Sequence, residues 1–213
     1  LATGVGKTRL MGAFIAYLHL AHGISNFFVL APNLTIYNKL IADFTPNTPK
    51  YVFKGISEFN LNPPRVIIGD NYEQQSANMA NLFGEINVNI FNISKINSEV
   101  RGGKEPRIKR MREVLGDSYF NHLANLPDLV LLMDESHRYR AQAGMRAINE
   151  LNPLFGLELT ATPFTESHKG PVAFQNVVMH YPLAQAMHDG FVKMPAAVTQ
   201  RDFNARNYTP AAI

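Results

Sequence analysis

The chain has 213 residues, of which 46% are hydrophobic and 17% charged, with a net charge of +3 and a pI near 9.1. This composition excludes a disordered chain, and the absence of cysteine excludes a disulfide scaffold and a cysteine-based zinc site. We expect a cytoplasmic protein with no membrane partner, whose positive charge permits a polyanionic partner without requiring one.

The first eight residues predict a phosphate-binding loop. Gly4 and Gly6 let backbone N–H groups approach a polyphosphate closely, because no Cβ blocks the way. Lys7 reaches the β- and γ-phosphates, and the Thr8 hydroxyl holds the bridging Mg²⁺. The strict pattern has glycine where this chain has Leu1, so a glycine-rich turn before a buried helix stays open as an alternative. The residues expected to bind the nucleotide are Gly4, Val5, Gly6, Lys7 and Thr8.

A phosphate loop connects a strand to a helix, and no strand precedes Leu1 in this sequence. We therefore expect a fragment that lacks its first core strand. Residues 8–22 are apolar on nearly all sides, which predicts a helix buried between layers and ended by Gly23.

Short apolar runs alternate with polar segments through the next part of the chain. Residues 26–31 predict a strand covered on both faces of a parallel sheet. Asn33 or Thr35 then caps a helix over residues 36–44. Further strands are expected at residues 51–54, 66–69 and 86–93, with a polar loop or solvated helix at residues 70–84.

Residues 98–112 concentrate basic side chains. They fit a nucleic-acid contact, since phosphate neutralisation by Lys and Arg dominates sequence-independent binding. A solvated loop that runs into a helix is the interpretation that we favour for them. A second helix, capped by Asp117 or Ser118, is expected to extend to Leu126. The basic residues are Arg101, Lys104, Arg107, Lys109, Arg110 and Arg112.

An apolar strand at residues 129–133 is followed at once by Asp134 and Glu135. Open parallel sheets bind ligands at the carboxyl ends of their strands, where both carboxylates would lie. Asp134 would hold Mg²⁺, and Glu135 would orient or deprotonate the attacking water. The alternative is a pair of helix N-terminal charges, which the helix dipole favours.

A second strand, at residues 155–159, ends in Thr160, Thr162 and a proline. Its two hydroxyls can hydrogen-bond the acidic segment and report the phosphate state, or they simply end a strand. Residues 181–192 predict a helix terminated by Gly190. Residues 193–213 are interpreted as the start of a connection to a further part of the protein that this sequence does not contain.

The order of these motifs resembles superfamily-two helicases of the DEAD/DEAH-box kind, and most closely the helicase (Res) subunit of type III restriction enzymes. The resemblance implies an α/β, RecA-like P-loop NTPase lobe with a mainly parallel sheet and helices on both faces. Residues 1–192 would be the first ATP-binding lobe, and residues 193–213 would lead to a second lobe. The segments that carry it read ATGVGKT, VLAPNLT, FNISKIN, MDESHR, LTATP and YPLAQAMHDGFVK.

The same resemblance implies roles for individual residues. Lys7, Asp134 and Glu135 look catalytic, with Thr8 and Asp134 as ligands of Mg²⁺. His137, Thr160 and Thr162 are similar to residues that couple hydrolysis to strand movement. The residues that match nucleic-acid contacts, to phosphates and not bases, are Pro32, Asn33, Thr35, Asn92, Ser94 and Lys95.

The implied function is ATP hydrolysis that drives movement on DNA, with ATP and Mg²⁺ as cofactors. The implied partners are DNA, most naturally duplex DNA bound through its backbone, a second lobe in the same chain, and a methyltransferase or specificity subunit. The second lobe would carry arginine fingers worth ~10³–10⁵ in rate, so these residues alone are expected to turn over little ATP. An RNA helicase, a P-loop phosphotransferase and a non-catalytic nucleotide-binding switch are the alternatives.

Overall fold

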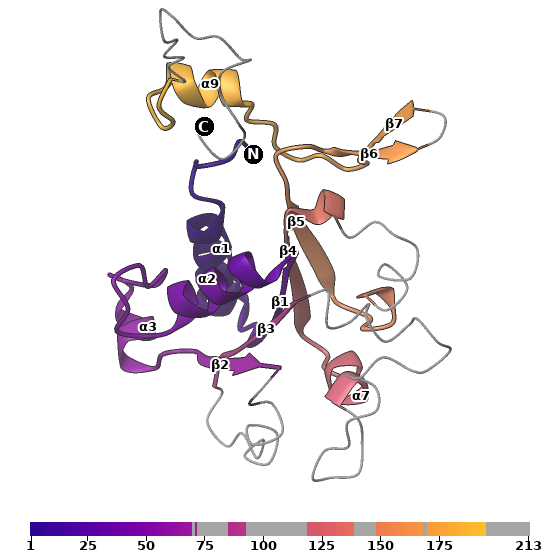
Figure 1. Cartoon of the computed structure of the whole chain (residues 1–213). Helices are drawn as coiled ribbons and strands as arrows, with labels where there is room; N and C mark the ends of the chain where they lie inside the picture. Colours follow the sequence, from indigo (N-terminus) through magenta and orange to yellow (C-terminus); the bar gives the residue numbers. More distant parts are fainter. Residues whose placement is uncertain (70, 72–84, 93–118, 139–147, 168–169, 195–213) are drawn as a thin grey trace, which may run out of the picture.

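The computed structural model describes residues 1–69, 71, 85–92, 119–138, 148–167 and 170–194 (Figure 1). Its centre is a five-stranded sheet in the order β2-β3-β1-β4-β5, in which every neighbouring pair is parallel. This confirms the expected α/β class. The strands are β1 (Asn26–Ala31), β2 (Arg65–Ile68), β3 (Asn87–Asn92), β4 (Leu129–Asp134) and β5 (Phe155–Leu159).

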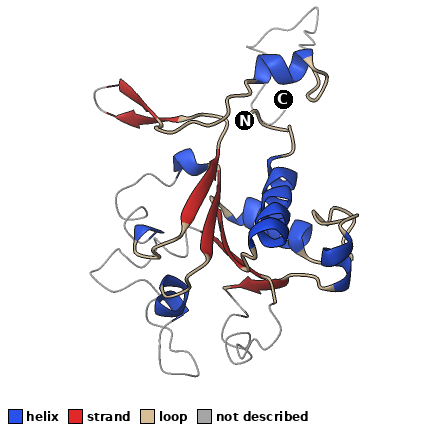
Figure 2. Ribbon diagram, turned by 180° about the vertical axis from the view of Figure 1, so that it is seen from behind, coloured by secondary structure: helices blue, strands red, loops and turns tan. Residues whose placement is uncertain are grey.

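Helices cover both faces of this sheet, as the sequence predicted. α1 (Lys7–His22), α2 (Leu34–Phe44) and α3 (Ser57–Leu61) lie on one face, and α7 (Tyr119–Ala124) lies on the other (Figures 1 and 2). The side chains of β1 alternate between the two cores: Phe27 and Val29 pack under α1 and α2, whereas Phe28 and Leu30 pack with α7. A continuously apolar strand is therefore buried on both sides.

The first helix differs from the expectation of burial on nearly all sides. Its inner face, with Met11 and Ile15, is fully buried, but Tyr17 and Leu20 are 58% and 57% exposed. The prediction of burial on nearly all sides is wrong, because only one face of α1 packs on the sheet and the apolar residues on its outer face stay exposed. The predicted C-terminus is confirmed, since Gly23 ends the helix with φ 69°.

The strand predicted at residues 51–54 is wrong, because these residues form a turn. Tyr51, Val52 and Phe53 are buried against the core as a strand would be. The backbone N–H of Val52, however, donates to the carbonyl oxygen of Asp43 at the end of α2, at 2.9 Å. Its backbone is satisfied by a helix end, so burial and β-prone residues here do not require a sheet.

The region after β5 also differs from the prediction. A β-hairpin that the sequence did not indicate, β6 (Phe164–Ser167) and β7 (Gly170–Ala173), projects from the sheet (Figure 1). α9 spans Leu183–His188, a shorter helix than the one expected over residues 181–192. Several predicted features lie outside the described residues: the basic segment 98–112, the predicted caps Asp117 and Ser118, most of segment 70–84, and residues 195–213. Within the described part of the chain, no helix is long and apolar enough to cross a bilayer.

Gly12 on α1 lies directly against Val52 in the turn that replaces the predicted strand. A Cβ at this position would lie 2.8 Å from Val52 Cβ, a contact that real structures do not tolerate. We expect Gly12→Ala to lower the free energy of unfolding by about 1–2 kcal/mol, because overpacking outweighs the gain in helix propensity. Chemical denaturation measures this change.

Gly156→Ala in β5 is the matched control for that substitution. Its new Cβ would meet Leu131 Cβ at 3.8 Å, an ordinary contact, so stability should change little. Equal effects of the two substitutions would show that steric contact at Gly12 is not the cause.

Candidate functional site

The carboxyl ends of four parallel strands converge at one edge of the sheet. Ala31 at the end of β1 pairs with Asn92 at the end of β3, and Asp134 at the end of β4 pairs with Leu159 at the end of β5. Open parallel sheets bind ligands at this edge. The strand register therefore brings together segments that are far apart in the sequence.

The phosphate-loop segment forms a turn that leads into α1. Gly4 and Gly6 have φ values of 88° and 93°, a region in which a Cβ is strained. α1 begins at Lys7, and its N-cap residue, Gly6, has no side chain with which to bond the first N–H groups. Its first turn contains no acidic residue. A helix start with these properties suits an anion such as a polyphosphate.

Contacts with two later segments hold this loop in place. The Ala2 N–H donates to the carbonyl oxygen of Tyr181 at 2.9 Å. The backbone nitrogen of Leu1 donates to the carbonyl oxygen of Thr160 at 2.8 Å. A Cβ on Gly4 would lie 3.7 Å from Val192 Cγ2. The loop therefore contacts both the end of β5 and the segment around α9.

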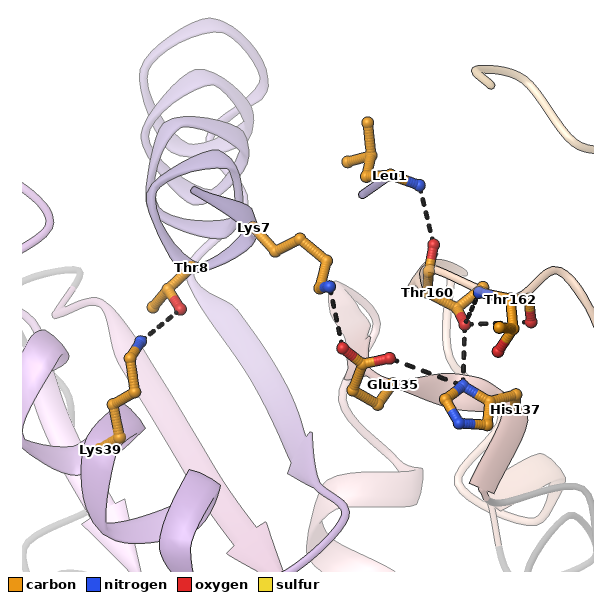
Figure 3. Close-up of polar contacts among 8 residues, drawn as sticks. All are labelled: Leu1, Lys7, Thr8, Lys39, Glu135, His137, Thr160 and Thr162. Atoms are coloured by element: carbon orange, nitrogen blue, oxygen red, sulfur yellow. Dashed lines mark hydrogen bonds and ion pairs between the residues drawn. The ribbon is translucent and has the colours of Figure 1, made fainter. Parts of the chain in front are cut away.

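Lys7 and Glu135 face each other across the site (Figure 3). Lys7 Nζ lies 2.8 Å from Glu135 Oε1, and the two side chains are only 9% and 17% exposed. Glu135 has φ 51°, which costs a non-glycine residue about 1–3 kcal/mol. This backbone turn directs the carboxylate at the end of β4 back toward α1.

The other oxygen of the Glu135 carboxylate meets a histidine on the short 3₁₀ helix η1 (Ser136–Arg138). His137 Nδ1 lies 3.5 Å from Glu135 Oε2 and 2.9 Å from Thr160 Oγ1. Thr160 Oγ1 in turn accepts from the Thr162 N–H at 3.1 Å. Glu135, His137 and Thr160 thus form one continuous polar chain from β4 to β5, which Thr162 joins through its backbone (Figure 3).

Asp134 and Thr8 supply hard oxygen atoms at the same edge. The Asp134 side chain is buried, and its burial, with the adjacent charge of Glu135, raises its pKa above the ordinary range. The charges of Lys7 and Lys39 act in the opposite direction. A buried carboxylate and a threonine hydroxyl are oxygen ligands of the kind that fit Mg²⁺, which takes few protein ligands beside substrate phosphates. No group of three metal-ligating side chains occurs among the residues that the structure describes.

The raised pKa of Asp134 predicts a stability effect with a definite sign. A carboxyl group with a higher pKa in the folded than in the unfolded state favours folding at low pH, and this contribution is lost as pH rises through the folded pKa. Without metal, Asp134→Asn should therefore have a higher melting temperature than the unsubstituted protein near neutral pH. A difference of about 2–4 °C corresponds to ~1 kcal/mol in a domain of this size, so thermal unfolding can detect a small effect of this sign.

Thermal unfolding in EDTA over a pH series measures that difference. The gap should close as pH falls toward 3.8, the ordinary value for Asp. A gap that does not change with pH would contradict the proposed cause. So would a lower melting temperature for the variant at neutral pH.

Lys39 is a residue of the site that the sequence analysis did not identify. Lys39 on α2 donates from Nζ to Thr8 Oγ1 at 2.9 Å and to Asp43 Oδ2 at 2.7 Å. The spacing of Lys39 and Asp43, four residues apart on a helix, is a sequence signal for their pairing. No local pattern links Lys39 to Thr8, 31 residues away.

The described residues among those expected to contact nucleic acid lie at the same edge but differ in exposure. Asn33 uses its side-chain oxygen to cap α2, accepting from the Ile36 N–H at 2.9 Å. Thr35 is exposed, whereas Pro32 and Asn92 are buried. Ser94 and Lys95 lie outside the described residues.

Comparison with known proteins gives one family. The family model described as type III restriction enzyme, res subunit, matches residues 1–165. This range includes the phosphate loop, the Asp134 and Glu135 pair, and the two threonines after β5. No curated protein gives a significant match to the chain.

Proposed function

The chain belongs to the family of the type III restriction enzyme res subunit, and on this premise we propose that it hydrolyses ATP to drive movement on DNA. Membership makes it a helicase-type, ATP-binding motor domain with a RecA-like P-loop fold. The observation that carries the proposal is the close approach of Lys7 to Glu135, at 2.8 Å, beside the phosphate loop. This contact brings Lys7, the proposed phosphate-binding cation, next to Glu135, the candidate general base.

The proposed roles follow from this geometry. Residues 4–8 would cradle the ATP phosphates, because their glycines have positive φ and α1 begins directly behind them, with its first N–H groups at that end of the helix. Thr8 and Asp134 would hold Mg²⁺, which neutralises phosphate charge. Before ATP binds, Lys7 and Glu135 neutralise one another.

Glu135 is proposed as the general base. Once Lys7 turns to the phosphates, the Glu135 carboxylate can accept a proton from the water that attacks the γ-phosphorus, with ADP as the leaving group. His137 contacts both Glu135 and Thr160 through the same ring nitrogen, Nδ1. These contacts make His137 and Thr160 candidates for coupling hydrolysis to movement, with Thr162 as their backbone partner.

The proposed partners are DNA, a second motor lobe and a further subunit. Thr35, which is exposed, and Asn33, which caps the start of α2, are proposed to contact a DNA backbone, and such contacts read no base sequence. Residues 1–192 are proposed as the first motor lobe, with residues 193–213 leading toward a second lobe and little turnover without it. A methyltransferase or specificity subunit and a cytoplasmic location complete the proposal.

Displacement of a third strand from duplex DNA tests this function in the whole protein. A translocase should release a triplex-forming oligonucleotide with ATP and Mg²⁺, but not with a non-hydrolysable ATP analogue. ATP hydrolysis without displacement would contradict movement on duplex DNA. Unwinding of an RNA duplex in place of displacement would favour an RNA helicase.

A further inference from the structure

Lys39 is the only described side chain for which a hydrogen bond to the Thr8 hydroxyl is observed. Its Nζ lies 2.9 Å from Thr8 Oγ1 and 2.7 Å from Asp43 Oδ2 (Figure 3 shows the first contact). The Lys39 side chain is 53% exposed, whereas Asp43 is 7% exposed. A flexible, half-exposed lysine is thus held between a fixed carboxylate and the hydroxyl of the phosphate loop.

The Thr8 hydroxyl is also one of the two proposed ligands of Mg²⁺. The Lys39 ammonium, 2.9 Å from that oxygen, is therefore a positive charge beside an atom that the metal ion would have to approach.

We propose that Lys39 is a positioning residue whose ammonium occupies the cation site between nucleotide-binding events and gives way to Mg²⁺, moving onto Asp43 alone. This inference rests on the proposed function, since it requires Mg²⁺ and a nucleotide to bind at Thr8. The reason is charge: an ammonium 2.9 Å from Thr8 Oγ1 repels a divalent cation that must approach the same oxygen to about 2.1 Å. The ammonium can stay paired with the Asp43 carboxylate, one helical turn along α2, when it leaves Thr8.

The proposal predicts effects of opposite sign for the two partners. Lys39→Gln removes the competing cation, so less Mg²⁺ should be needed for half-maximal nucleotide binding. Asp43→Asn is nearly isosteric and removes the charge that receives Lys39, so more Mg²⁺ should be needed. Each shift should be roughly fivefold, the upper range for a partly exposed ion pair.

A fluorescent ADP analogue, bound by the whole protein and titrated with MgCl₂, measures this directly without turnover. Lys54→Gln is the matched control, because it removes the same charge from an exposed position in the turn before α3. Thermal unfolding of each variant checks that Asp43→Asn remains folded. The double variant Lys39→Gln/Asp43→Asn should behave as Lys39→Gln alone.

Several results would overturn the proposal. If Lys39→Gln raises the Mg²⁺ requirement, Lys39 supports the metal site and does not compete with it. If Lys39→Gln and Lys54→Gln change the requirement equally, the effect is one of net charge. Mg²⁺-dependent nucleotide binding that is unaltered by Lys39→Gln would refute this inference and leave the proposed function standing, whereas no nucleotide binding by the unsubstituted protein would refute both.

Discussion

In the whole protein, Glu135→Gln is expected to lower ATP turnover by ~10²–10⁴-fold, the usual contribution of a positioned general base. The amide has nearly the same shape as the carboxylate but cannot accept the proton of the attacking water. Nucleotide binding should be retained or tightened, because Lys7 loses the carboxylate that holds it at 2.8 Å. Steady-state hydrolysis and equilibrium binding of a fluorescent nucleotide separate these two effects.

Glu58→Gln is the control for that experiment, since Glu58 is exposed on α3 and bonds the Asn62 amide at 3.1 Å. It should leave turnover unchanged. Normal turnover in Glu135→Gln would remove this residue from the mechanism. Loss of binding together with turnover would instead indicate that Glu135 is structural.

Lys7→Ala is expected to abolish Mg²⁺–ATP binding within the measurable range. The substitution removes the cation proposed to reach the phosphates, and truncating one member of a buried charge pair costs about 2–5 kcal/mol. It also leaves the Glu135 carboxylate, which is 17% exposed, without its ammonium partner. Lower thermal stability is therefore expected alongside the loss of binding.

The double variant Lys7→Ala/Glu135→Gln separates the two consequences, because it removes the charge on both sides. It should recover thermal stability but not nucleotide binding. Lys50→Ala, at an exposed position, controls for the loss of a lysine. Unchanged nucleotide affinity in Lys7→Ala would contradict the phosphate-loop assignment.

The parts of the fold that were predictable are those determined by local sequence. Residues 26–31 are continuously apolar and β-prone, and they form β1 with the predicted bounds. Asn33 caps α2 as one of the two predicted candidates, because its side chain reaches the Ile36 N–H within a single turn. The position of Asp134 was also predictable, because it is the last residue of the apolar strand β4 and therefore lies at the carboxyl edge of the sheet.

The parts that were not predictable depend on contacts distant in sequence. Residues 51–54 have the composition of a strand, but Val52 bonds to the end of α2 and packs against Gly12. The positive φ of Glu135 is not a property of glutamate and follows only from the turn between β4 and η1. The contact of Lys39 with Thr8 depends on the packing of α2 beside α1, which no local pattern encodes.

The central claim is that residues at this sheet edge form an ATPase activated by nucleic acid. Steady-state ATPase of the whole protein, with and without duplex DNA, single-stranded DNA or RNA, tests it most directly, with Glu135→Gln as the blank. Stimulation by duplex DNA, absent from the blank, is the predicted result. Hydrolysis that no nucleic acid stimulates, or a blank as active as the unsubstituted protein, would contradict the claim.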